Sequence, residues 1–135
     1  MNHEAVAKEL AKIRTDATAI LPLIDKPEWS QIETAGVAAT IAAIYSGFEH
    51  IFVQLCANKV RKNDHWHMEL LKSAVEERIV PLEMQSVLKE MLAFRHIQRN
   101  YYGHELREPE VRKKANEIMT IIEPFEKHIS EWLKI

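Results

Sequence analysis

The residues with the clearest chemical potential lie between Phe94 and Leu106, a stretch that contains two arginines, an asparagine, two tyrosines and two histidines. No acidic residue occurs between Glu90 and Glu105, so this stretch is locally positive although the whole chain has a formal net charge of −2. The planar guanidinium of Arg99 suits two phosphate oxygens at once. The imidazole of His104 exchanges a proton near neutral pH. Together these side chains can hold a phosphate and move a proton.

Two neighbours extend this candidate site. Asn100 can donate a hydrogen bond to a phosphate or accept one from a ribose hydroxyl, because its amide carries both functions. Tyr102 can stack on a base, as aromatic residues do when proteins bind single-stranded RNA. We therefore expect Asn100 to assist catalysis and Tyr102 to contact the substrate.

A helical row on the same segment changes from apolar to basic along its length. Its members are spaced by four and three residues: Leu88, Leu92, Arg95, Arg99 and Tyr102. We expect the first half to pack on other helices and the second half to leave the core or face a partner. Arg95 would then contact the substrate phosphate. The equal alternative is that Arg95 is a structural partner of Glu49 or Glu90.

Arg99 and His104 are five positions apart, which places them ~140° apart around an ideal helix. They therefore do not share a face of one straight helix. Either Gly103 bends the helix and swings His104 round, or the two residue types meet across a symmetric dimer.

The elements that position these residues are predicted to be helices. The chain has only three glycines, helical periodicity dominates, and no stretch alternates strictly enough for a strand. We expect Pro22 to end the first helix, Asp64 to cap the third, and Pro124 to kink or split the last. The second helix has the widest apolar face, typical of a central helix. These features predict an all-α, up-and-down bundle of about five helices, at residues 4–21, 30 or 33 to 59, 65–77, 81–102, and 109 nearly to the end.

Composition limits the class of protein. The 135 residues fit one domain, 1–135, and 47% hydrophobic with 28% charged residues is ordinary for a soluble globular protein. The small net charge excludes wholesale attraction to nucleic acid or membranes. There is no secretory signal, no uninterrupted apolar run approaches ~20 residues, and the single Cys56 forms no intramolecular disulfide. We expect a cytoplasmic protein with no membrane partner.

A metal reading of Asp64, His65 and His67 is not favoured. Residues two apart do not face each other on a helix, and no matching cluster of cysteines or histidines completes a tetrahedral site. We therefore expect no metal and no cofactor.

Several segments together resemble a known family. The run from Arg99 to His104 matches the Arg-x4-6-His signature of HEPN-domain ribonucleases. The segment Tyr45-Ser46-Gly47-Phe48-Glu49-His50-Ile51 resembles helix 2 of HepT-like proteins, Trp66-His67-x-Glu69-Leu70-Leu71 resembles their helix 3, and Phe94-Arg95-His96 with Tyr102-Gly103 and Glu105-Leu106 resembles their helix 4. The resemblance covers about residues 33 to 107.

The resemblance implies a homodimer in which arginine and histidine from both chains line an interface cleft and cut RNA without a metal. His104 would deprotonate a ribose 2′-hydroxyl or protonate the leaving oxygen, Arg99 would stabilise charge on the phosphate, and Asn100 would orient the phosphate or the histidine. It also implies a toxin paired with a small nucleotidyltransferase antitoxin. The alternative is a non-catalytic helical module that docks such a nucleotidyltransferase.

One position departs from the family pattern. HepT-like toxins can be silenced by adding AMP to a tyrosine two residues after the histidine, and this chain has Leu106 there. Modification at that position is therefore impossible, and Tyr101 and Tyr102 are conceivable substitutes.

Overall fold

The computed structural model describes residues 3–60, 63–100 and 106–134, and within them it contains helices and no strands. This confirms the all-α class and the helical bundle. The elements are, in chain order, α1 (His3–Ile24), α2 (Gln31–Cys56), the 3-10 helix η1 (Ala57–Lys59), α3 (Trp66–Glu76), the 3-10 helix η2 (Leu82–Met84), α4 (Gln85–Asn100) and α5 (Glu108–Leu133).

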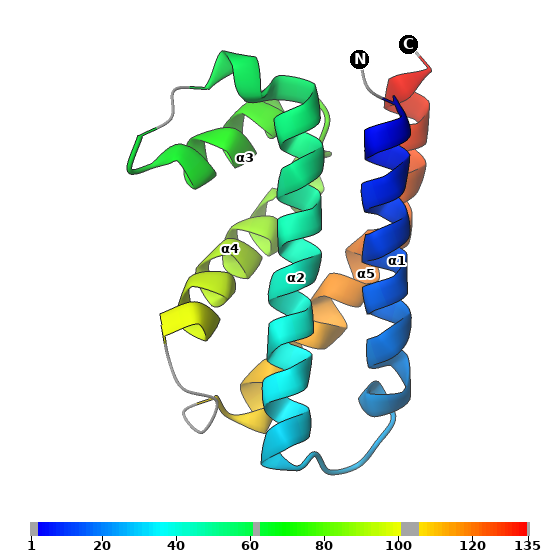
Figure 1. The fold of residues 1–135 in the computed structure, drawn as a ribbon, viewed down its shortest axis with the longest axis vertical. Helices are drawn as coiled ribbons and strands as arrows, with labels where there is room; N and C mark the ends of the chain where they lie inside the picture. Colours follow the sequence, from blue (N-terminus) through cyan, green and yellow to red (C-terminus); the bar gives the residue numbers. More distant parts are fainter. Residues whose placement is uncertain (1–2, 61–62, 101–105, 135) are drawn as a thin grey trace.

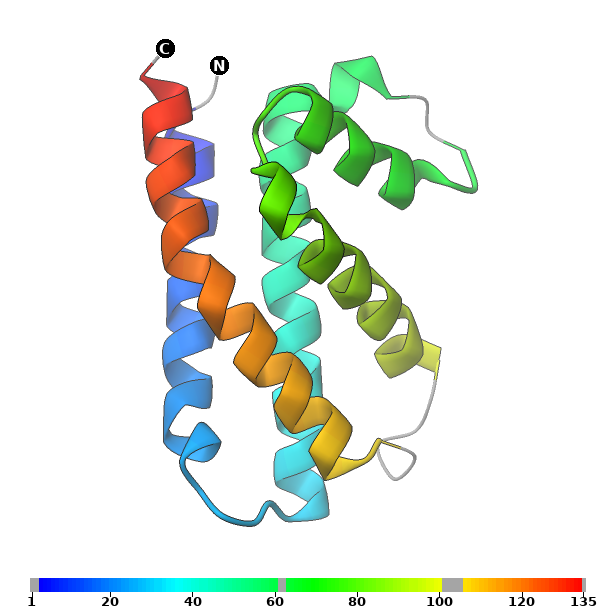
Figure 2. The ribbon, with the colours of Figure 1, turned by 180° about the vertical axis from the view of Figure 1, so that it is seen from behind.

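Helix α2 forms the centre of the bundle (Figure 1). It packs against α1, α3, α4 and α5. Helix α1 runs beside α2 in the opposite direction, α4 slants across the other side of α2, and α3 lies across one end. Figure 2 shows α5 crossing the bundle diagonally in its first half and then turning to run beside α1. The start of α1 and the end of α5 therefore lie at the same end of the molecule.

The central position of α2 explains its apolar composition. The wide apolar face that the sequence predicts for it is buried almost entirely, with residues such as Ile41, Tyr45 and Phe48 fully inaccessible to solvent. Although the sequence has no uninterrupted apolar run approaching ~20 residues, α2 is long and apolar enough on average to cross a membrane. Its most apolar window has a mean hydropathy of 1.4. Because 61% of that window is buried against the other helices, the core position accounts for the composition.

Helix ends differ from the sequence expectations at three places, and of the two outcomes expected at Pro124, a kink or a split, the split does not occur. Helix α1 continues past Pro22 to Ile24, because a proline in the last turn removes only one backbone hydrogen bond. Asp64 does not cap α3, since Asn63 Oδ1 accepts from the His65 amide instead and α3 begins at Trp66. Pro81 precedes η2, and α4 begins only at Gln85.

The start of α2 is fixed by a capping box. Ser30 is the N-cap, the Glu33 amide donates to Ser30 Oγ at 3.1 Å, and Glu33 Oε1 accepts from the Ser30 amide at 2.8 Å. Lys26 donates to the other Glu33 oxygen at 2.6 Å, and this hydrogen bond is the main reason the pKa of Glu33 lies below its ordinary value.

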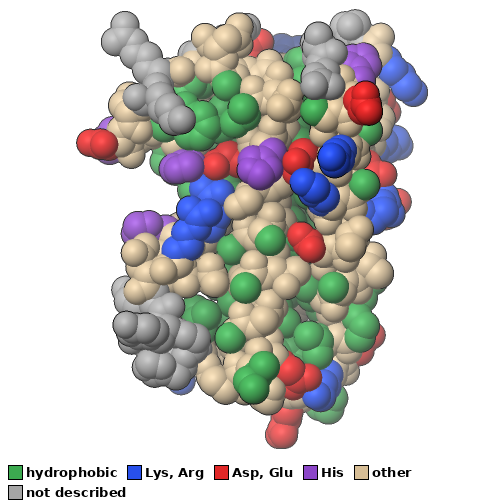
Figure 3. All heavy atoms as spheres, in the orientation of Figure 1, with side chains coloured by type: hydrophobic (Ala, Val, Ile, Leu, Met, Phe, Trp, Pro, Cys, Tyr) green, Lys and Arg blue, Asp and Glu red, His purple; other side chains and the backbone are tan. Residues whose placement is uncertain are grey.

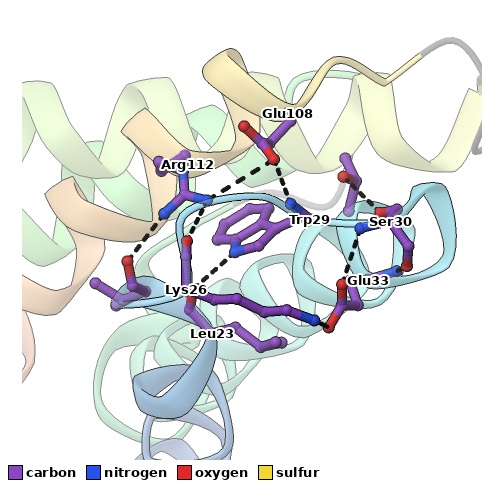
Figure 4. A network of polar contacts seen from close by, with 9 residues as sticks. Leu23, Lys26, Trp29, Ser30, Glu33, Glu108 and Arg112 are labelled. Atoms are coloured by element: carbon purple, nitrogen blue, oxygen red, sulfur yellow. Dashed lines mark hydrogen bonds and ion pairs between the residues drawn. The ribbon is translucent and has the colours of Figure 1, made fainter.

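The loop between α1 and α2 is locked onto the start of α5 by Trp29 (Figure 4). The indole Nε1 donates to the Leu23 carbonyl, and the Trp29 amide donates to the Glu108 carboxylate. The Arg112 guanidinium stacks on the indole, 4.2 Å from the ring centroid, and donates to the carbonyls of Ile24 and Lys26. These contacts tie three helix ends together at the end of the bundle opposite the termini.

Gly47 allows α1 and α2 to approach closely. A methyl group placed on Gly47 would lie 2.7 Å from Ile13 Cγ1, which is closer than two carbon atoms can pack. Gly36, on the same helix, has nothing within 4 Å of such a methyl group. The glycine in the Tyr-x-Gly-x-Glu segment is therefore required by helix packing.

We expect opposite effects from the two substitutions Gly47→Ala and Gly36→Ala. Gly47→Ala should lower the free energy of unfolding by about 1–3 kcal/mol, because Ile13 must move inside a packed core. Gly36→Ala should raise it by about 0.5–1 kcal/mol, because alanine restricts the unfolded chain without a clash. Urea unfolding of both variants measures this, and equal effects would contradict the close approach of α1 and α2.

Candidate functional site

The described part of the predicted motif lies at the C-terminal end of α4. Arg99 and Asn100 are exposed in the last turn. Asn100 Nδ2 donates to the His96 carbonyl at 2.7 Å and lies 3.3 Å from the nearer nitrogen of the His96 ring. The Asn100 side chain therefore folds back on its own helix. The cation of Arg99 is favourably placed at the negative end of the helix dipole.

The remaining predicted site residues, Tyr102 and His104, lie outside the described residues. The chain is described again from Leu106, which is buried with 8% of its surface exposed and belongs to the core. The position where the family carries its modified tyrosine is thus a packing position in this protein.

Arg95 belongs to a buried polar cluster, which we call the Glu49 network: Glu49 and Ser46 from α2, His67 from α3 and Arg95 from α4. Arg95 Nη2 donates to both Glu49 oxygens, at 3.2 and 3.1 Å, and Arg95 Nη1 donates to Ser46 Oγ at 3.1 Å. Only 3% of Arg95 and 6% of Glu49 is exposed. Of the two roles expected for Arg95, substrate contact and structural pairing, the structure shows the structural one. Its partner is Glu49 and not Glu90.

The helical row on α4 was expected to leave the core or face a partner in its second half, which starts at Arg95, and this expectation is corrected here. The row does not leave the core at Arg95, because a carboxylate on α2 receives the guanidinium. It becomes exposed one turn later, at Arg99. Glu90 pairs instead with Lys114 of α5 at 3.2 Å, and this hydrogen bond holds the pKa of Glu90 below its ordinary value.

His67 completes the Glu49 network. Its Nδ1 lies 2.9 Å from Glu49 Oε2 and 3.3 Å from Arg95 Nη2. The sequence singled out His67 only for metal binding and as part of the helix 3 resemblance. The signal that could have found its role was Glu49, whose carboxylate sits on an apolar stripe of α2 and needs partners when buried.

The described residues contain no candidate metal-binding site. Within residues 3–60, 63–100 and 106–134, no group of three histidine, cysteine, aspartate or glutamate side chains is arranged to hold an ion.

Comparison with known proteins agrees with this geometry. A family model described as "HepT-like protein" matches residues 36–135. The chain belongs to the HepT-like family. It is thereby a member of the HEPN superfamily and of its toxin-type proteins in general. No curated protein and no solved structure gave a significant match.

The matched range shows which parts of this HepT-like protein are shared with its family. It begins at Gly36 and so includes most of α2 and all of α3, α4 and α5, with the complete Glu49 network and the Arg99 end of α4. Helix α1 lies before it.

We expect Glu49→Ala to destabilise the protein severely, by about 3–5 kcal/mol, because it leaves the Arg95 guanidinium buried without a counter-charge. Urea unfolding at pH 7 measures this. Glu126→Ala is the matched control, since Glu126 forms an ion pair with Arg14 on the surface, where 60% of the Arg14 side chain is exposed. A similar loss in both variants would show that the Glu49 network has no special weight.

Tyr45 gives a second prediction about this cluster. The Arg95 guanidinium lies over the Tyr45 ring, 4.9 Å from the ring centroid. The buried Tyr45 hydroxyl has no hydrogen-bond partner among the described residues. Burial, reinforced by the Glu49 charge, raises the pKa of Tyr45 above its ordinary value, and Arg95 opposes this only in part. The folded state therefore keeps Tyr45 neutral where the unfolded chain ionises, so this contribution to stability is complete below pH ~10 and is lost as the pH rises further.

Tyr45→Phe should keep the free energy of unfolding at pH 7 unchanged or raise it by about 1 kcal/mol, because phenylalanine retains the ring and removes an unpaired buried hydroxyl. The variant should also lose less stability than the parent between pH 9 and 11. Urea unfolding across this range tests both points. A loss of more than 1 kcal/mol at pH 7 would mean that the hydroxyl has a partner in solution.

Proposed function

We propose that this HepT-like protein is a metal-independent endoribonuclease that acts as a symmetric homodimer, with Arg99 and His104 as its catalytic residues. The proposal is carried by one observation: the chain belongs to a HEPN-type family, and its Arg-x4-6-His spacing from Arg99 to His104 starts at an exposed helix end. No hydrogen bond or ion pair within the described part of the chain holds the Arg99 guanidinium, so it is free to take a phosphate.

The chemistry needs no cofactor. In the proposed reaction, the 2′-oxygen of a ribose attacks the adjacent phosphorus and the bond from phosphorus to the 5′-oxygen breaks. His104 takes the proton from the 2′-hydroxyl or supplies one to the leaving oxygen. Arg99 stabilises the extra negative charge on the phosphate as it becomes pentavalent. The products are a 2′,3′-cyclic phosphate and a 5′-hydroxyl.

We propose a dimer because Arg99 and His104 lie ~140° apart around one straight helix and therefore do not share a face within one chain. Two α4 ends brought together would place an arginine of one chain near a histidine of the other. Asn100 reaches the phosphate only when its amide leaves the His96 carbonyl. Tyr102 is proposed as a base contact.

The biological setting proposed here is a cytoplasmic toxin with a nucleotidyltransferase antitoxin. Because Leu106 occupies the position of the tyrosine that accepts AMP, and is buried, silencing at that position is ruled out by its chemistry. The antitoxin would act by docking or by modifying another residue.

A second candidate is a non-catalytic module that docks a nucleotidyltransferase. The observation that favours it is that two of the predicted site residues already serve the fold: Arg95 within the Glu49 network and Asn100 at the helix end.

The decisive test is RNA cleavage by the purified protein in EDTA, beside the variants Arg99→Ala and His104→Ala. Loss of a proton-transfer residue should reduce the rate by about 10²–10⁴-fold, and loss of Arg99 by about 10²–10³-fold. Arg107→Ala and His50→Ala are the matched controls, because both side chains are exposed and lie outside the motif. They should cleave like the parent.

Cleavage that is equal in all five proteins would be contamination and would reject the enzyme. Absence of cleavage together with stable co-purification of a nucleotidyltransferase would establish the docking module instead.

A further inference from the structure

A groove of about 510 Å³ runs between the start of α3 and the outer face of α4. We call it the α3–α4 groove. Figure 3 shows histidine side chains beside a patch of lysine and arginine side chains on this face of the molecule. The residues that line the groove are Asp64, His65, His67, Met68, Lys89, Leu92, Ala93, His96 and Ile97.

The Glu49 network fixes the orientation of His67 at the edge of this groove. The shorter contact, 2.9 Å between His67 Nδ1 and Glu49 Oε2, assigns the proton to Nδ1, because a carboxylate can only accept. The 3.3 Å approach of Arg95 Nη2 to the same nitrogen is then not a hydrogen bond, since both groups are donors. Arg95, which is itself buried, holds that carboxylate in place through both of its oxygens. The other ring nitrogen, Nε2, has no partner among the described residues, and half of the side chain is exposed.

The charges of the groove favour an anion. Lys89 is positive, and the imidazole nitrogens of His65, His67 and His96 can donate hydrogen bonds. Asp64 is the one acidic residue in the lining. When His67 is protonated, Nδ1 donates to Glu49 and Nε2 becomes a donor available to a ligand.

The groove also has an apolar part next to these charges. Met68 and Ile97 are 44% and 42% exposed, and both contribute to the lining together with Leu92. An apolar surface beside cationic and hydrogen-bond-donating side chains suits a nucleotide, whose base covers the apolar part while its phosphate contacts the donors. Ile97 is followed within two residues by Arg99, so a strand in the groove would continue toward the end of α4.

We propose that the α3–α4 groove binds single-stranded RNA, with His67 Nε2 as the donor to a backbone phosphate and Met68, Leu92 and Ile97 as the surface for a base. This inference rests on the proposed ribonuclease function, since it assigns the path of the substrate beyond Arg99. His67 is the key contact because it is the only residue of the lining that the Glu49 network holds rigid, among the described residues.

The test is fluorescence anisotropy with a labelled eight-nucleotide oligouridine that carries 2′-O-methyl groups, in EDTA at pH 6. The 2′-O-methyl groups prevent cleavage, so the measurement does not depend on catalysis. His67→Gln should weaken binding about tenfold, because the variant loses a hydrogen bond from a charged donor. Glutamine can still donate to Glu49, which preserves the fold.

The matched control is His50→Gln. His50 is also an exposed histidine whose Nδ1 contacts a carboxylate, Glu9 Oε2 at 3.4 Å, but it lies outside the groove. It should bind like the parent. The double variant Lys89→Gln, His96→Gln is a second probe that leaves the Glu49 network intact, and it should weaken binding at least as much as His67→Gln.

Absence of binding by the parent, or equal affinity of the parent and both groove variants, would overturn the proposal. A variant Ile97→Asp that dissociates a dimer while oligonucleotide affinity is unchanged would assign the groove to a second copy of the chain and also overturn it. Loss of affinity in the groove variants, with cleavage unaffected by Arg99→Ala and His104→Ala, would keep the groove and reject the proposed catalytic residues.

Discussion

The buried pair of Glu49 and Arg95 is the interaction on which the arrangement of α2, α3 and α4 depends. An unpaired charge in the core costs several kcal/mol, so the two helices that carry these residues are held in one register. His67 adds α3 to the same carboxylate. Because α4 is fixed at Arg95, the exposed position of Arg99 one turn later follows from the core. The candidate site is therefore oriented by a contact inside the bundle.

Most of the fold follows from the period of the apolar residues. The stripes on α1, α2 and α5 repeat every three or four residues, and the residues that form them are buried, because burial of one face is what such a pattern specifies. The ends of helices follow less well. Pro22 and Asp64 were expected to end and begin helices from their intrinsic preferences. However, α1 accepts a proline in its last turn, and α3 begins after His65 without a capping side chain.

The site shows the limit of sequence reasoning more sharply. Arg95 and Arg99 are the same residue type on one helical row, yet the first is buried and the second is exposed. Their different roles depend on whether a carboxylate of α2 lies opposite, and a pattern within α4 contains no information about that. Gly47 is a second example. A side chain is excluded at this position because Ile13 of α1, more than thirty residues away in the sequence, lies too close to it.

The adjacent chain ends have a practical consequence. Both ends of the described chain lie at one end of the bundle, and the Arg99 end of α4 lies away from them (Figure 1). A purification tag or a fused domain at either terminus therefore leaves the exposed end of α4 accessible. The same closeness suits circular permutation, in which a short linker joins the old termini and the chain is opened elsewhere. The loop locked by Trp29 is a poor place for that opening, because cutting it would release contacts among α1, α2 and α5.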